Sequence, residues 1–82
     1  MRLDKFVESV FKKYDLPDAW MHEVQLIAAG KSSEDSAAER GVTRDAVKQQ
    51  RKKILEKLQM EDSRAIITHL FHVAVSKLPA KE

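Results

Sequence analysis

The chain has 82 residues, which allow one domain with one small hydrophobic core. An active-site cleft of ordinary size is hard to build at this length, so an enzyme is the least favoured class. The absence of cysteine excludes disulfides, thiolate zinc sites and cysteine nucleophiles. The sequence has no apolar run of membrane-spanning length, and its first residues lack the apolar core of a signal peptide. We therefore expect a cytoplasmic protein with no membrane partner.

Helices are the regular elements that the sequence predicts. It contains no alternating run of β-branched residues and no Asn-Gly hairpin turn, and glycine and proline number two each. The net charge of +2 is unevenly distributed. Residues 1–35 contain five basic and seven acidic side chains, whereas residues 36–82 contain ten basic and six acidic side chains. The positive charge is therefore concentrated in the second half of an all-α chain.

The first predicted helix is amphipathic and lies within residues 1–15. Asp4 is its expected N-cap, and the segment 15–18, "DLPD", ends it because a residue before proline resists helical geometry. We favour packing of this helix on its own domain, where it enlarges a small core; a dimer or partner helix is the alternative. Membrane-surface binding is less favoured because its polar face is mixed in charge. The apolar residues recur at spacings of three and four: Leu3, Phe6, Val7, Val10, Phe11 and Tyr14.

Two shorter helices are expected next. Asp18 is the expected cap of a helix over residues 19–29, which ends at Gly30. Ser32 or Ser33 is expected to cap the following short helix, which ends at Gly41.

The fourth predicted helix covers residues 44–58 and carries most of the positive charge. Thr43 is its expected N-cap. At about 100° per residue, Val47, Ile54 and Leu58 share one narrow wedge, which predicts the face toward the core. Six basic and two acidic side chains lie within residues 44–57. A helix with one apolar seam and basic or amide groups elsewhere suits a DNA major groove, where such groups contact phosphates and base edges.

The last predicted helix starts after a cap at Asp62 or Ser63 and runs to about Leu78, followed by a frayed tail at residues 79–82. It has more apolar residues than one small core can accept. Some of this surplus is expected to meet a second copy of the chain, or to be covered by the N-terminal helix. The predicted dimer interface consists of Ile66, Ile67, Leu70, Phe71 and Ala74.

The pattern A37-x-x-x-G41-V42-T43-x-x-A46-V47 has helix-turn-helix spacing, with a small residue at the helix contact and glycine in the turn. The ordered motifs of residues 16–75 resemble the DNA-binding domain of the LuxR-type (GerE-like) bacterial transcription regulators. They are "LIAAG" (26–30), Ser32, Ala37, Val42-Thr43, Val47-Lys48, Ile54, Lys57-Leu58, and Ser63-Arg64 with Ile67.

This resemblance implies a four-helix domain over residues 16–78, preceded here by the extra N-terminal helix. The third family helix enters the major groove, and the fourth commonly forms a dimer. By position, Lys48 and Gln50 are expected to contact bases, and Val47 belongs both to the core wedge and to this set. The residues expected at double-stranded DNA are Thr43, Arg44, Ala46, Val47, Lys48, Gln50, Arg51 and Lys57.

The chain departs from the family pattern in the scaffold helix. Ser36 stands where the family usually has Ile, Arg40 where it usually has Leu, and Glu34 where a polar or basic residue is frequent. These departures motivate a rival to a stand-alone, homodimeric DNA-binding regulator. The rival is a protein-interaction module that antagonises or assists another regulator or RNA polymerase. A third hypothesis is a relative of the promoter-reading domain of sigma factors.

No catalytic residue, cofactor or metal site is predicted. His69 and His72 are three residues apart on the last helix, a spacing that can hold a metal. No further ligand is expected on the same face, so we interpret the pair as incidental. The serines of residues 32–36 lack a nucleophile setting, and a glycine-rich phosphate loop is absent.

Overall fold

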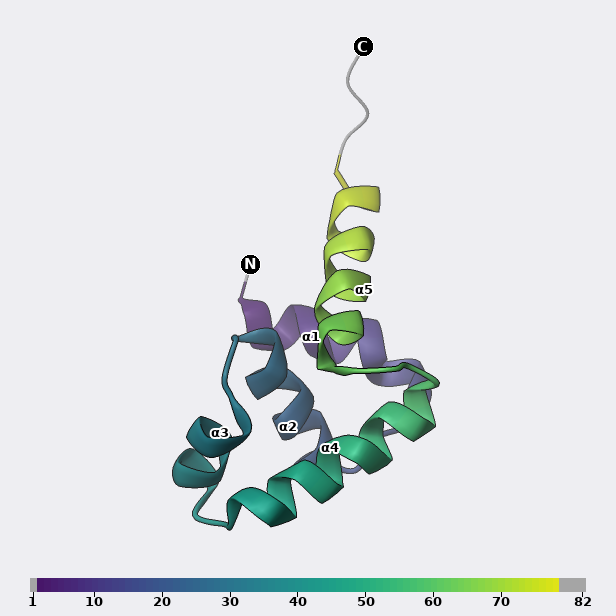
Figure 1. Cartoon of the computed structure of the whole chain (residues 1–82). Helices are drawn as coiled ribbons and strands as arrows, with labels where there is room; N and C mark the ends of the chain where they lie inside the picture. Colours follow the sequence, from purple (N-terminus) through teal and green to yellow (C-terminus); the bar gives the residue numbers. More distant parts are fainter. Residues whose placement is uncertain (1, 79–82) are drawn as a thin grey trace.

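The computed structural model describes residues 2–78, and this part of the chain is all-helical, as predicted (Figure 1). It contains five α-helices and one short 3₁₀ segment, η1, and no β-strand. No helix between residues 2 and 78 combines the length and the apolar character needed to cross a membrane. The tail at residues 79–82, predicted to fray, lies outside the described residues. The elements are α1 (Leu3–Phe11), η1 (Lys12–Tyr14), α2 (Asp18–Ala28), α3 (Ser33–Arg40), α4 (Arg44–Leu58) and α5 (Ser63–Ser76).

Three helices begin at the predicted capping residues. The side chain of Ser32 accepts a hydrogen bond from the backbone N–H of Asp35, at 3.1 Å. Thr43 caps α4 through the N–H of Ala46, also at 3.1 Å. The side chain of Asp62 caps α5 in the same way, at 3.0 Å. Each bond satisfies one of the backbone donors that a helix leaves free in its first turn.

The starts of α1 and α2 differ from the prediction. α1 begins at Leu3 and α2 at Asp18, so Asp4 and Asp18 lie inside the first turns and do not cap them. A carboxylate there still stabilises the helix, because the N-terminal end carries partial positive charge. The end of α1 also differs, since the chain tightens into η1 after Phe11 and leaves the helix at Asp15, whose φ is 54°.

One hydrophobic core joins the N-terminal helix to the rest of the domain. Phe6, Val7 and Phe11 of α1 are buried in the same cluster as residues of α2, α4 and α5. Of the two roles considered for the N-terminal helix, the structure therefore shows packing on its own domain. The boundary predicted between residues 15 and 16 therefore does not divide the hydrophobic core. The other buried members are Val24, Ile27, Ile54, Leu58, Ile66 and Leu70.

α3 and α4 are joined by the three residues 41–43, and α4 then runs along one edge of the molecule (Figure 1). Gly41 has a φ of 70°, a left-handed conformation that glycine adopts without steric cost, and it ends α3 as predicted. α5 packs on the core with its first turns, while its later turns extend away from the other helices (Figure 1). This arrangement leaves two surfaces free, one along α4 and one along α5.

Candidate nucleic-acid interface

α4 has one apolar seam and a broad basic surface. Val47, Ile54 and Leu58 are buried, as the helical spacing predicted. The exposed cations of α4 lie around the rest of the helix, over a length of about 22 Å at the usual rise per residue. We call these five side chains the basic face: Arg44, Lys48, Lys52, Lys53 and Lys57.

The cations of the basic face are not neutralised within the described residues. The ion pairs found between residues 2 and 78 both involve Glu23, which lies on α2. Asp45 and Glu56 are the only carboxylates on α4, against five exposed cations. The face therefore presents a net positive charge to solvent, and this charge is available to an anionic partner.

A buried carboxylate holds α3 and α4 to α2. The Glu23 side chain is fully buried, and its Oε1 accepts hydrogen bonds from Ser36 Oγ at 2.6 Å and from Arg40 Nη1 at 2.5 Å. Its Oε2 accepts from Arg51 Nε at 2.6 Å, and Arg51 also donates through Nη2 to the Lys31 carbonyl oxygen at 2.9 Å. We call Glu23, Ser36, Arg40 and Arg51 the Glu23 cluster. It connects three helices through one side chain.

The Glu23 cluster gives Ser36 and Arg40 of α3 a structural role. Ser36 is fully buried, and Arg40 and Arg51 keep only 14% and 11% of their side chains exposed. An isolated carboxylate would not be buried in an apolar environment, so its three donors are required partners. The polar residues Ser36 and Arg40 are thus the contacts that attach α3 to α2.

Glu23 was not singled out from the sequence, although a signal for it exists. It lies three residues after Trp20 and four before Ile27, on the apolar side of α2, where a charge needs a partner. Ser36 and Arg40 are four residues apart and so share one side of α3. An acidic residue on one apolar face and a polar pair on a neighbouring helix together indicate a buried ion pair.

The structure corrects two members of the predicted DNA-binding set. The prediction for Val47 is wrong, because this side chain is 1% exposed and belongs to the core. Arg51 is also misplaced in that set, since its guanidinium is bonded to Glu23 and to the Lys31 carbonyl. Gln50 is half-buried and accepts a hydrogen bond from Arg40.

The five other predicted DNA-binding residues are exposed. Thr43 and Ala46 are exposed in the turn and the first part of α4, on the same helix as Arg44, Lys48 and Lys57. The predicted set omitted three exposed basic or amide side chains of this helix, although their helical positions away from the core were evident. They are Gln49, Lys52 and Lys53.

The predicted dimer interface is divided between the core and the surface. Ile66 and Leu70 fill the chain's own core, so their assignment to a dimer interface is wrong. Ala74 is exposed and lines a hollow of about 280 Å³ together with Phe6, Lys77 and Leu78. α1 does not cover the apolar side chains of the last helix that remain outside the core. We call the exposed residues at spacings of three and four the apolar stripe: Ile67, Phe71, Val75 and Leu78.

The histidines of α5 pack against aromatic rings. The ring of His69 lies 5.7 Å from that of Phe11, and the ring of His72 lies edge-on to Phe71 at 6.2 Å. Among residues 2–78, no three histidine or acidic side chains are grouped closely enough to hold a metal ion. These packing contacts give the histidines a structural explanation.

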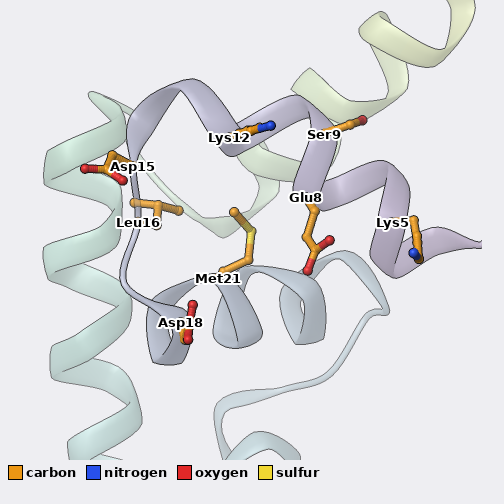
Figure 2. Close-up of a pocket in the computed structure, with 8 residues that line it drawn as sticks. All are labelled: Lys5, Glu8, Ser9, Lys12, Asp15, Leu16, Asp18 and Met21. Atoms are coloured by element: carbon orange, nitrogen blue, oxygen red, sulfur yellow. The ribbon is translucent and has the colours of Figure 1, made fainter.

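A groove of about 460 Å³ lies between α1, η1 and α2 (Figure 2). Leu16 and Met21 line it together with charged side chains of both signs. Figure 2 shows that Lys5, Lys12 and Asp15 are spread along the groove and do not converge on one point. A small-molecule site usually has a few polar groups directed at one ligand, so the groove is a weaker candidate than the basic face.

Comparison of the chain with protein-family models, with curated proteins and with solved structures gives no match.

Proposed function

We propose that the protein is a LuxR-type helix-turn-helix regulator that binds double-stranded DNA through α4. The observation that carries the proposal is the basic face, five exposed cations on one helix that follow a three-residue turn. DNA carries a dense row of phosphates, and cations without internal partners can neutralise them directly. α4 is long enough to lie in a major groove, and Arg44 and Lys48 are in its first turns, where a recognition helix contacts bases.

The proposed regulator acts as a homodimer through α5. The apolar stripe supports this part, since Phe71 is 66% exposed on α5, which extends away from the core, and Leu78, two residues after the end of α5, is 67% exposed. Two copies would present two α4 helices to a two-fold symmetric site. Phe71→Asp, which puts a charge in the stripe, should convert the dimer to a monomer in sedimentation velocity while helicity stays unchanged. A wild-type chain that sediments as a monomer at high concentration would contradict the dimer.

Fluorescence anisotropy with selected and random duplexes across a salt series tests DNA binding. The variant Lys48→Glu/Lys52→Glu reverses two charges of the basic face, and we expect binding to fall by more than about tenfold. Arg51 is unsuitable for this test because its reversal would place a second carboxylate beside Glu23.

The matched control is Lys5→Glu/Lys12→Glu. It changes the net charge by the same amount at two exposed residues beside the groove of α1 (Figure 2). DNA binding that weakens with salt, is lost in the α4 variant and persists in the control would establish the interface. Equal binding by both variants would contradict it.

A second function is favoured by the charge of α3. Glu34, Asp35 and Glu39 are exposed on the helix that precedes the proposed recognition helix. Carboxylates near a phosphate backbone oppose binding, whereas they suit a basic protein partner. A protein-interaction module that assists or antagonises another regulator or RNA polymerase is therefore the alternative. Weak binding to every duplex, together with tight binding to a purified partner through α3, would favour it.

A further inference from the structure

The side chain of Gln50 is oriented by a buried neighbour. Its Oε1 accepts a hydrogen bond from Arg40 Nη1 at 2.5 Å, and the same Nη1 donates to Glu23 Oε1 at 2.5 Å. Glu23 is fully buried and Arg40 is 14% exposed, so the donor is held in place by the core. Gln50 is therefore attached to the Glu23 cluster, and its amide does not turn freely.

Chemistry fixes which end of the amide Arg40 holds. A guanidinium has N–H donors and no acceptor, so the Gln50 atom that it contacts is the carbonyl oxygen. The NH₂ group makes no hydrogen bond within the described residues. No side-chain N or O atom of those residues is both buried and unpaired, so this NH₂ group reaches solvent. Gln50 thus presents its donors outward, while its oxygen is held toward Arg40 with one of two lone pairs engaged.

Gln49, its neighbour on α4, provides a contrast. It is exposed, and neither end of its amide is bonded to another side chain or to the backbone within residues 2–78. A free glutamine pairs with adenine through two bonds, donating to N7 and accepting from N6. Gln49 can turn its amide to make that pair. The Gln50 oxygen has two lone pairs, and Arg40 occupies one of them and holds the oxygen toward α3, so the accepting half of the pair is disfavoured at Gln50.

We infer that Gln50 acts mainly as a donor and favours guanine over adenine at the base it contacts. This inference rests on the proposed function of α4. Guanine presents two acceptors in the major groove, N7 and O6, while adenine presents one acceptor and one donor. The outward donors of Gln50 therefore match guanine, whereas the N6 donor of adenine meets these donors instead of the oxygen that Arg40 holds. We expect a preference of about tenfold, within the range for one base contact.

The test first selects duplexes from a randomised pool with the wild-type protein, and then with Gln50→Ala. The base whose preference disappears in Gln50→Ala identifies the position that Gln50 contacts. Anisotropy is then measured on four duplexes that differ only at this position. Guanine should bind about ten times more tightly than adenine in the wild type, and Gln49→Ala should leave this ratio unchanged.

Arg40→Met releases the Gln50 oxygen and leaves Glu23 with two of its donors, Ser36 and Arg51. Circular dichroism establishes that this variant is folded, and the preference at the same position should move toward adenine. A wild-type preference for adenine, or an unchanged preference in a folded Arg40→Met variant, would overturn the inference.

The same experiment separates this inference from the proposed function. Selective, salt-dependent binding that Gln50→Ala leaves unchanged would overturn the role of Gln50 and leave the role of α4 intact. Failure to select any duplex would overturn both.

Discussion

α1 and α3 are both short helices, of 9 and 8 residues, yet they are attached to the domain by different physics. α1 is held by buried apolar side chains, with Phe11 fully enclosed. α3 is held largely by hydrogen bonds and ion pairs to one buried carboxylate, Glu23. An apolar attachment is tolerant of small shifts, whereas a buried ion cluster demands its partners in fixed places. α3 lies next to the proposed recognition helix, so the directional attachment is found where orientation matters.

The largest effect should come from the apolar attachment. Phe11→Ala removes a fully buried ring that packs against Tyr14 and His69, and we expect a loss of about 4 kcal/mol in the free energy of unfolding. Urea denaturation followed by circular dichroism measures it. Leu3→Ala is the control, because Leu3 is 45% exposed on the same helix and should change stability by less than about 0.5 kcal/mol. Equal losses in the two variants would show that α1 is not part of the core.

The polar attachment should come next. Glu23→Gln removes the charge that compensates Arg40 and Arg51, and it places an NH₂ group against a donor. We expect a loss of about 3 kcal/mol, below that of a fully enclosed pair because both arginines keep partial access to water. Glu8→Gln, an exposed glutamate on α1, should have almost no effect in the same urea titration. A Glu23→Gln variant as stable as the wild type would contradict the cluster's structural role.

A helix cap gives a smaller effect and isolates α4 from the Glu23 cluster. Thr43→Ala removes the side-chain oxygen that accepts from the Ala46 N–H, and should cost about 1 kcal/mol. Thr43→Ser keeps this oxygen and serves as the control. The same loss in both variants would mean that the hydroxyl does not cap the helix.

The smallest effect is predicted when the whole Glu23 cluster is replaced by apolar side chains, so that α3 is attached as α1 is. The combination Glu23→Leu, Ser36→Ala, Arg40→Leu and Arg51→Met replaces the cluster by apolar side chains of similar total size. Such exchanges are often neutral or stabilising, so the variant should be within about 1 kcal/mol of the wild type. Thermal unfolding checks this. A loss as large as that of Glu23→Gln would show that the site cannot be repacked with apolar groups.

The difference between α1 and α3 also explains which features of the structure the sequence could predict. The periodicity of α1 and α4 predicted their buried residues, and caps such as Ser32 and Thr43 marked helix starts, because both signals are local. The expected N-cap was two residues late for α1 and one residue late for α2, since an acidic residue near a helix start suits the cap and the first turn alike. The Glu23 cluster joins residues up to 28 positions apart, and no local pattern brings them together.

On the candidate surfaces of α4 and α5, features set by one helix were likewise predictable, and features set by contacts between helices were not. Exposure of Lys48 and Lys57 follows from one helix, so their positions on the surface were predictable. Arg51 is a cation on the same helix, yet its partner is on α2, and its helical position gave no warning of this contact. Ile66 and Leu70 were likewise expected at a dimer interface, because the sequence does not show which side of α5 meets α1.

The central claim is that the outer face of α4 is the surface that contacts DNA, and NMR titration tests it most directly. Addition of a short duplex to the isotope-labelled protein should shift the backbone amides of residues 43–53 progressively, and the shifts should shrink as salt is raised. The amides of α1 should stay in place. Shifts centred on α3 or α5, or no shifts at all at low salt, would contradict the claim and favour a protein partner.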